Sequence, residues 1–460
     1  MLSLTLRYRA WLDRWGPMLP LLIAEGTIWL GFGALLPILP IYFTRHGVDL
    51  PTLGIVVAAW PAARLIGEPF FGWVADRSSR KKMMVVGLVL ASGVAVLPLF
   101  IVGPIAFIAL RALAGLCASI YDPAARGYLV DANPPERQGE TFGYYGAAQV
   151  GGFMVGPAIG GIAAAITGEP TVVFWVAGIM LLVSALLVAA RVRDIAHPPR
   201  VHAAATTPVD PAHTAVDPAH TAVDPAHTAV DPAHTPVVAD GPSGGRLLNR
   251  LLVAAIVFNI GSFFASGSYE VVWSLYLTSL GAGLDAIGLT FATFSLPVLL
   301  LSPFTGRFMD REGGFIALVA GMAGIAVCGI LYPLIPEVWF VAVLGLAEGV
   351  AFAFASPALY ILVARASPAG RSSTAQGLFG AAGTIGMIVA SLGAGFLAEE
   401  NLSYPFYAAG IGTGAALLLG LAVGRRRLWE AMQPSHLAAT PMPAATPMPA
   451  ATPSLEEVPG

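Results

Sequence analysis

Twelve stretches of roughly 20 apolar residues, separated by short polar turns, constrain the fold of this chain more than any other feature of its sequence. A helix of about 20 residues is long enough to cross the ~30 Å hydrocarbon core of a bilayer. Charged residues make up only 11% of the chain, against roughly 25% in soluble domains. We therefore expect an all-α membrane protein with spans near 18–43, 52–74, 83–102, 104–127, 140–166, 171–190, 248–277, 286–308, 314–334, 337–363, 372–398 and 403–424.

The stretches form two groups of six, which divide the chain into an N-terminal half, 1–190, and a C-terminal half, 248–424. Between them, 191–247 repeats Val-Asp-Pro-Ala-His-Thr-Ala, and a proline in every repeat excludes a continuous helix. We interpret this segment as a disordered cytoplasmic linker, and the repetitive segment 425–460 as a disordered cytoplasmic tail. The linker histidines are interpreted as repeat expansion, with a metal or pH sensor as the alternative: His213, His220, His227 and His234.

Basic residues predict the orientation of the spans. Of the 24 Lys and Arg residues, 21 fall in the N-terminal segment, the even-numbered connections and the C-terminal tail, and the others are Arg45, Arg64 and Arg111. Because basic loops remain in the cytoplasm, we expect both termini and the linker there. The opposite loops carry acids instead: Asp49, Glu169, Asp285, Glu337, Glu399 and Glu400.

The two halves align with each other at a constant offset of 234 residues, as in the pairs Gly54 and Gly288, and Pro123 and Pro357. Both copies begin on the cytoplasmic side, so the repeats are parallel. Two parallel six-helix repeats joined by a linker are typical of a transporter whose halves rock around a site near the middle of the membrane.

The loop after the second span carries a Gly-x-x-x-Asp-Arg-x-x-Arg-Lys pattern, formed by Gly72, Asp76, Arg77, Arg80 and Lys81. This pattern resembles the signature loop of the major facilitator superfamily, although Val74 and Ser79 stand where Leu and Gly are usual. The second repeat keeps Gly306, Asp310 and Arg311 but lacks the final basic pair. The resemblance implies the major facilitator fold, with 12 helices in two repeats.

The resemblance also implies a gate. The acid of the loop, Asp76, would pair with nearby arginines and face the positive N-terminus of the eleventh helix, which begins near Ser372. Arg126 is a further candidate partner of this acid. The alternative for the basic residues of the loop is a signal of topology alone.

Glycines recur on one face of the fifth span, within Gly143–Gly161. Such a face lets another helix approach backbone to backbone, and a proline removes an amide donor and bends the helix. The pattern resembles the antiporter motif of exporters in the superfamily, carried by Gly143, Gly152, Gly156, Pro157, Gly160 and Gly161. Arg111 and Gly115 resemble a second motif, which is found in proton-coupled drug exporters.

By this resemblance, the first, fourth, seventh and tenth helices line the cavity, and each carries a charge: Glu25, Arg111, Glu270 and Glu348. A carboxyl group in such a cavity can bind and release protons near neutral pH. Glu25 is the first candidate for proton coupling, and its repeat mate is the polar Asn259. Alternatively, Arg111 extends to the outer surface and Glu270 lies at the rim.

We therefore expect a proton-coupled exporter of small, lipophilic or cationic, drug-like molecules that works by alternating access. An importer or uniporter of a metabolite is the alternative. No set of catalytic residues or metal ligands is evident, so neither an enzyme, a cofactor nor a metal site is predicted, and an ion gradient would drive transport. We expect a monomer in the plasma (inner) membrane, whose partners are its substrate and the bilayer and not nucleic acid.

Overall fold

The structure is a computed structural model that describes residues 18–75, 77–133, 138–194, 248–367 and 372–433. Asp76, the linker repeats and the tail beyond 433 lie outside these ranges. The side chains of Asp310 and Arg311, and the surroundings of Gly143 and Gly306, are also outside the description. The expectations for these residues therefore stay predictions.

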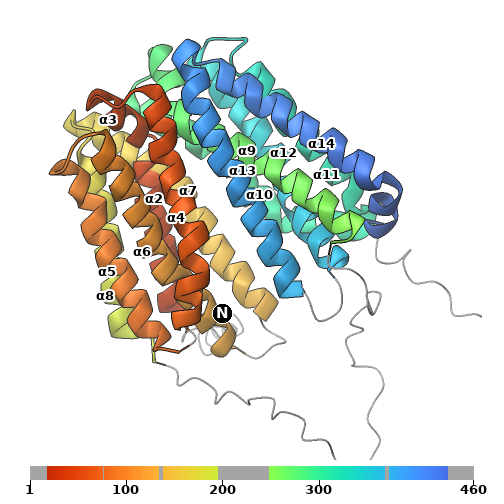
Figure 1. The fold of residues 1–460 in the computed structure, drawn as a ribbon, viewed down its shortest axis with the longest axis horizontal. Helices are drawn as coiled ribbons and strands as arrows, with labels where there is room; N and C mark the ends of the chain where they lie inside the picture. Colours follow the sequence, from red (N-terminus) through yellow and green to blue (C-terminus); the bar gives the residue numbers. More distant parts are fainter. Residues whose placement is uncertain (1–17, 76, 134–137, 195–247, 368–371, 434–460) are drawn as a thin grey trace, which may run out of the picture.

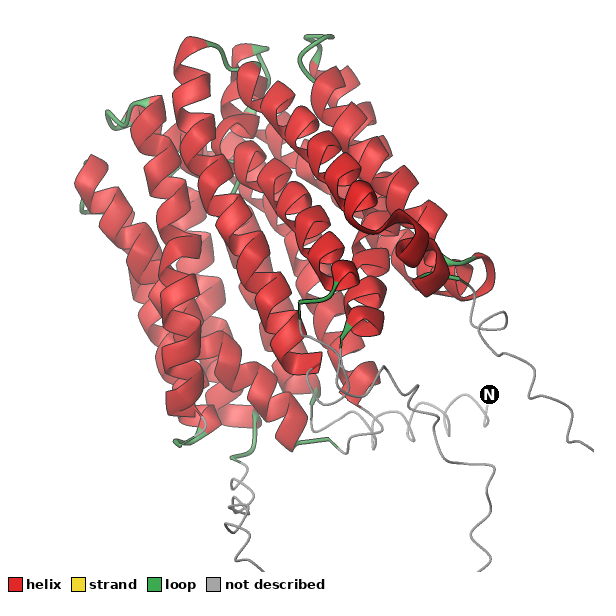
Figure 2. Cartoon of the chain, turned by 45° about the vertical axis from the view of Figure 1, so that its right-hand side comes forward, coloured by secondary structure: helices red, strands yellow, loops and turns green. Residues whose placement is uncertain are grey.

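The described chain is built of helices joined by short connections (Figure 2). The N-terminal half contains α2 (Leu19–Leu35), α3 (Leu39–Arg45), α4 (Leu50–Ala75), α5 (Arg80–Val96), α6 (Pro104–Asp131), α7 (Gln138–Thr167) and α8 (Val172–Arg191). The C-terminal half contains α9 (Arg250–Ser279), α10 (Leu284–Glu312), α11 (Gly314–Leu331), α12 (Val338–Ala366), α13 (Ser372–Glu400) and α14 (Tyr404–Ala431). Within the described ranges, 11 helices are long and apolar enough to span a membrane, and the pair α2 and α3 makes the twelfth span. The prediction of 12 spans is confirmed.

The first span is broken, which the sequence prediction of one span over 18–43 did not include. Its two pieces, α2 and α3, meet at an angle of 40°. Pro37 has no amide hydrogen to donate to the helix before it, so α2 ends at Leu35. Pro40 then occupies the first turn of α3, where a missing donor costs nothing.

Among the described residues, the two halves share a core at only one end of the bundle. We name the end with the 46–49, 168–171 and 281–283 connections the acidic end, and the opposite end the basic end. One buried cluster joins Tyr42 and Phe43 of α3 to Val271 and Leu277 of α9, at the acidic end. Toward the basic end, each half has a core of its own. The halves are therefore joined at the acidic end, where the bundles come together at the top of Figure 1.

Glycines let α7 touch its neighbours backbone to backbone, as the sequence predicted. A methyl group added at Gly152, Gly156 or Gly160 would overlap a backbone carbonyl of α2. On another side of α7, Gly161 packs against Gly288 of α10, in the other half. The predicted packing face is confirmed.

The repeat offset relates this contact to a second one. Gly54 of α4 packs against Gly395 of α13, and these two residues are the repeat mates of Gly288 and Gly161. The halves therefore meet along two equivalent seams, α7 with α10 and α4 with α13. We call them the glycine seams.

The last helix continues beyond 424, where the sequence analysis placed the start of a disordered tail. α14 bends at Gly424, whose backbone is not helical, and then continues to Ala431. Leu428 and Met432 are buried, and the amide of Gly314 donates to the carbonyl of Met432 at 2.9 Å. The predicted boundary at 425 is therefore corrected, because 425–433 is part of the folded C-terminal half.

Arg365 fastens this extension, because its Nη1 donates to the carbonyls of Ala431 at 2.6 Å and Gln433 at 3.1 Å. Arg365→Ala should lower the stability of the purified protein by about 1 kcal/mol, since Arg365 is exposed and such bonds are worth ~1.5–3 kcal/mol when shielded. Thermal unfolding measures the change. Arg426→Ala is the control, because Arg426 is 94% exposed and contacts only Glu430 among the described residues. Equal melting temperatures for both variants would contradict this role.

Candidate functional site

Glu25 is fully buried on α2, inside the N-terminal half. Its Oε1 accepts hydrogen bonds from Trp29 Nε1 at 2.9 Å and Gln149 Nε2 at 2.7 Å, and its Oε2 accepts one from Tyr121 at 2.6 Å. The donors come from α2, α7 and α6, so three helices position one carboxyl group. All three donors are neutral, and a proton can therefore join Glu25 without breaking an ion pair.

Arg111 and Glu270 join the two halves. Arg111 Nη2 of α6 lies 2.7 Å from Glu270 Oε1 of α9, and both side chains are nearly buried. Arg111 Nε is buried and has no hydrogen-bond partner in the described part of the chain. Arg111 does not extend to the surface here, because it is only 8% exposed and pairs with Glu270, which is 12% exposed. The position of Glu270 relative to the rim stays a prediction.

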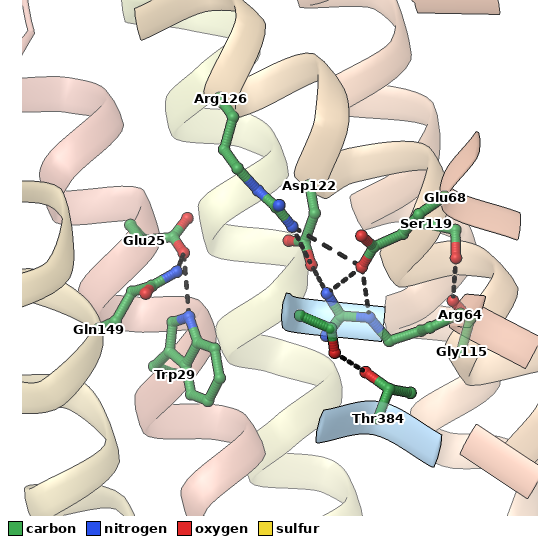
Figure 3. A network of polar contacts seen from close by, with 11 residues as sticks. Glu25, Trp29, Arg64, Glu68, Gly115, Ser119, Asp122, Arg126, Gln149 and Thr384 are labelled. Atoms are coloured by element: carbon green, nitrogen blue, oxygen red, sulfur yellow. Dashed lines mark hydrogen bonds and ion pairs between the residues drawn. The ribbon is translucent and has the colours of Figure 1, made fainter. Parts of the chain in front are cut away.

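Four further charges lie on α4 and α6 and are drawn in Figure 3: Arg64, Glu68, Asp122 and Arg126. We call them the charge quartet. Arg64 Nε donates to Glu68 at 2.9 Å, and Arg64 Nη2 contacts both Glu68 and Asp122. Arg126 is less tightly held, since its Nη2 lies 3.7 Å from each acid. The i,i+4 spacing indicates the bond between Arg64 and Glu68, but not the bond to Asp122 on another helix.

Trp60 lies between the charge quartet and the ion pair of Arg111 and Glu270. The guanidinium of Arg64 is 4.6 Å from the centre of its ring, and that of Arg111 is 5.9 Å away. Phe32 stacks on Trp60 at 5.4 Å, and Trp29 contacts Phe32 edge to face at 5.6 Å. An aromatic row therefore leads from the charge quartet to Glu25.

Glu348 and Asn259 do not join Glu25. Glu348 is buried within the C-terminal half and accepts a hydrogen bond from Tyr332 at 2.6 Å. Asn259 donates its amide to the carbonyl of Phe379 at 2.8 Å, which fastens α9 to α13. The amide of Asn259 is thus used in helix packing in this structure, and the place of Asn259 among the cavity residues stays a prediction.

The signature loop is partly described. Arg77 lies over the ring of Trp73 at 4.0 Å and donates to its carbonyl. Arg80 forms an ion pair with Asp131 at 2.6 Å, which the sequence analysis did not anticipate. Lys81 is half-buried, and Gly72 lies against Pro123 with room for a methyl group.

Gln149 and Asp131 are the residues of this region that sequence reasoning missed. Gln149 could have been found as a lone amide in the apolar part of the fifth span, since buried polar groups in membrane helices are rare and need partners. Asp131 carries no comparable signal, because it follows the apolar stretch and looks like a loop acid. No group of three or more possible metal ligands occurs among the described residues.

Comparisons with known proteins agree on a family. The family model described as Major Facilitator Superfamily matches residues 21–269 and 254–436. The quinolone resistance protein NorA of Staphylococcus aureus is 33% identical over 142 residues, which are 30% of this chain and only 36% of that protein. An uncharacterized MFS-type transporter of Methanocaldococcus jannaschii is 22% identical over 380 residues, 82% of this chain and 90% of that protein. The fold is similar to the crystal structure of a mutant of the nucleoside transporter NupG, with a TM-score of 0.68, 13% identity, and coverage of 88% of this chain and 99% of the other.

Proposed function

The chain belongs to the major facilitator superfamily of transporters, and on that premise we propose that it exports small molecules in exchange for protons. Glu25 carries this proposal. It is a fully buried carboxyl group with three neutral hydrogen-bond donors, and in the described part of the chain it has no basic partner. Protonation and cargo binding can therefore compete for the same acid as the halves rock.

The direction of transport is proposed from two features. The glycine face of α7 resembles the antiporter motif of exporters, and it carries Gln149, a donor to Glu25. The matched relative NorA is named for quinolone resistance. The comparison covers about a third of NorA, so its activity enters here as a proposal. An importer or uniporter is the second candidate, favoured by the fold shared with a nucleoside transporter.

Two gates would alternate. Arg111 and Glu270, which form an ion pair between the halves, would close the acidic end. The signature loop would close the basic end in the opposite state, through Asp76, its neighbour Arg77, the partner Arg126 and the second copy at Asp310. We further propose that the basic end faces the cytoplasm of a cell whose inner membrane holds the transporter as a monomer.

Glu25→Gln tests the proposal. We expect the loss of proton-coupled efflux, because an amide cannot bind and release the proton, while expression and folding are retained. A panel of cargo molecules is added outside inverted vesicles whose lumen has been acidified, and a pH-sensitive dye follows the proton movement that cargo triggers. Glu400→Gln, an exposed acid at the acidic end, is the matched control. Unchanged coupling in Glu25→Gln would remove Glu25 from the mechanism, and transport by the wild type that an uncoupler does not affect would favour the uniporter.

A further inference from the structure

The charge quartet of Arg64, Glu68, Asp122 and Arg126 has no net charge, and its role is not explained by the proton exchange at Glu25. Two positive and two negative groups alternate across α4 and α6. Charges inside a membrane protein are costly and usually functional. The question is what these four groups bind.

The fold does not require them. At the repeat offset of 234 residues, the corresponding positions in α10 and α12 hold uncharged residues: Val298, Ser302, Ser356 and Tyr360. α10 and α12 still pack against each other, as when Gly349 of α12 lies against the backbone of Phe294. The same helix pair therefore assembles without charges in the other half, and packing alone does not explain the quartet.

Arg126 is the loosely held member. Its side chain is 48% exposed, while that of Arg64 is 17% exposed. Its ion pairs are 3.7 Å long, and it makes no hydrogen bond to the described residues. A guanidinium in this state can bind a planar carboxylate through two parallel hydrogen bonds.

An aromatic row begins beside Arg64 of the quartet. Trp60 lies under Arg64, and the row through Phe32 and Trp29 ends at Glu25. Aromatic rings of a ligand stack favourably on such side chains. A ligand that reaches the quartet from this row would therefore combine an aromatic body with charged ends.

We propose that the charge quartet is a subsite for cargo molecules that are aromatic zwitterions. The cargo carboxylate pairs with Arg126, and the cargo ammonium group pairs with Glu68 and Asp122. A zwitterion takes over these ion pairs with no charge left unpaired, whereas a pure cation or a pure anion leaves one protein charge without a partner. The proposal rests on the proposed export of small molecules and narrows the charge of the cargo.

The test compares three forms of one molecule. Norfloxacin is an aromatic zwitterion at neutral pH, its ethyl ester is a cation, and its N-acetyl derivative is an anion. Binding to the purified full chain is measured by equilibrium dialysis, with the fluorescence of the probe as the readout. The wild type should bind the zwitterion about tenfold more tightly than the ester or the N-acetyl form, a difference of ~1.4 kcal/mol.

Two variants change the charge of the quartet in opposite directions. Arg126→Gln leaves the site with an excess negative charge, so the ester should become the preferred ligand. Glu68→Gln leaves an excess positive charge, so this variant should bind the N-acetyl form about tenfold more tightly than the wild type does. Each variant gains affinity for one probe, and misfolding does not produce such a gain. A role of Arg126 in gating alone would change the transport of all three forms in proportion.

The outcomes separate this proposal from the proposed function. The same order of affinities in the wild type and both variants would overturn the subsite, as would a wild type that prefers the ester or binds none of the three forms. Proton-dependent export of the ester with no preference among probes would leave the exporter proposal standing and remove the subsite. Retained zwitterion preference without proton-dependent export would leave the subsite standing and remove the exporter proposal.

Discussion

Gly156→Ala is expected to destabilise the protein by about 2–3 kcal/mol, a large effect for one methyl group. The added carbon would overlap the carbonyl of Leu30 and would lie 2.9 Å from the Cα of Gly33. Both are backbone atoms of α2, so no side chain can move aside. The overlap must therefore separate α7 from α2, which holds Glu25. Thermal unfolding of the purified protein measures the loss.

Gly151→Ala is the matched control for Gly156→Ala. It is the same chemical change on the same helix, and nothing lies within 4 Å of the added carbon. Alanine favours a helix over glycine by about 1 kcal/mol at both sites, so the control should be as stable as the wild type or slightly more stable. If the two variants were equally stable, the close contact between α7 and α2 would be refuted.

Arg111→Gln is expected to open the acidic end. It leaves the carboxylate of Glu270 buried without a cation, and breaking such a pair costs ~3–5 kcal/mol. The protein can relieve this cost by separating its halves and hydrating Glu270. A shift of this size moves a two-state population by about 100-fold or more. Spin labels at Glu169 and Glu337, exposed acids of opposite halves at this end, should therefore report longer distances.

The double variant Arg111→Gln with Glu270→Gln separates this cause from general damage. With both charges removed, neither position leaves an unpaired buried charge, and the distances should return toward those of the wild type. The labels require a background in which the buried Cys117 and Cys328 are replaced by alanine. Wild-type distances in the single variant would show that the pair does not hold the halves together.

The helices could be predicted from the sequence, and several local contacts with them. Apolar stretches of span length locate all 12 spans, because lipid leaves few alternatives to a helix. The glycine face of α7 and the bond between Arg64 and Glu68 follow from the periodicity of a single helix. The break between α2 and α3 carries a signal in Pro37, but the apolar stretch continues through it and conceals the break.

Contacts between distant segments could not be predicted in the same way. Arg111 and Glu270 are 159 positions apart, and only the arrangement of the two halves brings them together. Asn259 occupies the position of Glu25 in the second repeat, but the repeat mate of Gln149 is Gly383. A side chain at 383 would meet the amide of Asn259, and in its absence Asn259 turns to the backbone of α13. The repeat conserves the backbone, while the site depends on which side chains fill it.

The hydrogen bond from Trp29 to Glu25 has a spectroscopic consequence. The indole Nε1 donates to the same Oε1 that would lose its charge when Glu25 binds a proton, and a bond to an ionised acceptor is shorter and stronger than a bond to a neutral one. The near-ultraviolet absorption of an indole responds to the partner of its N–H group. The difference spectrum between the wild type and Trp29→Phe should therefore follow the protonation of Glu25 during turnover. The chain thus contains a native chromophore that reports on its own carboxyl group, with no dye attached.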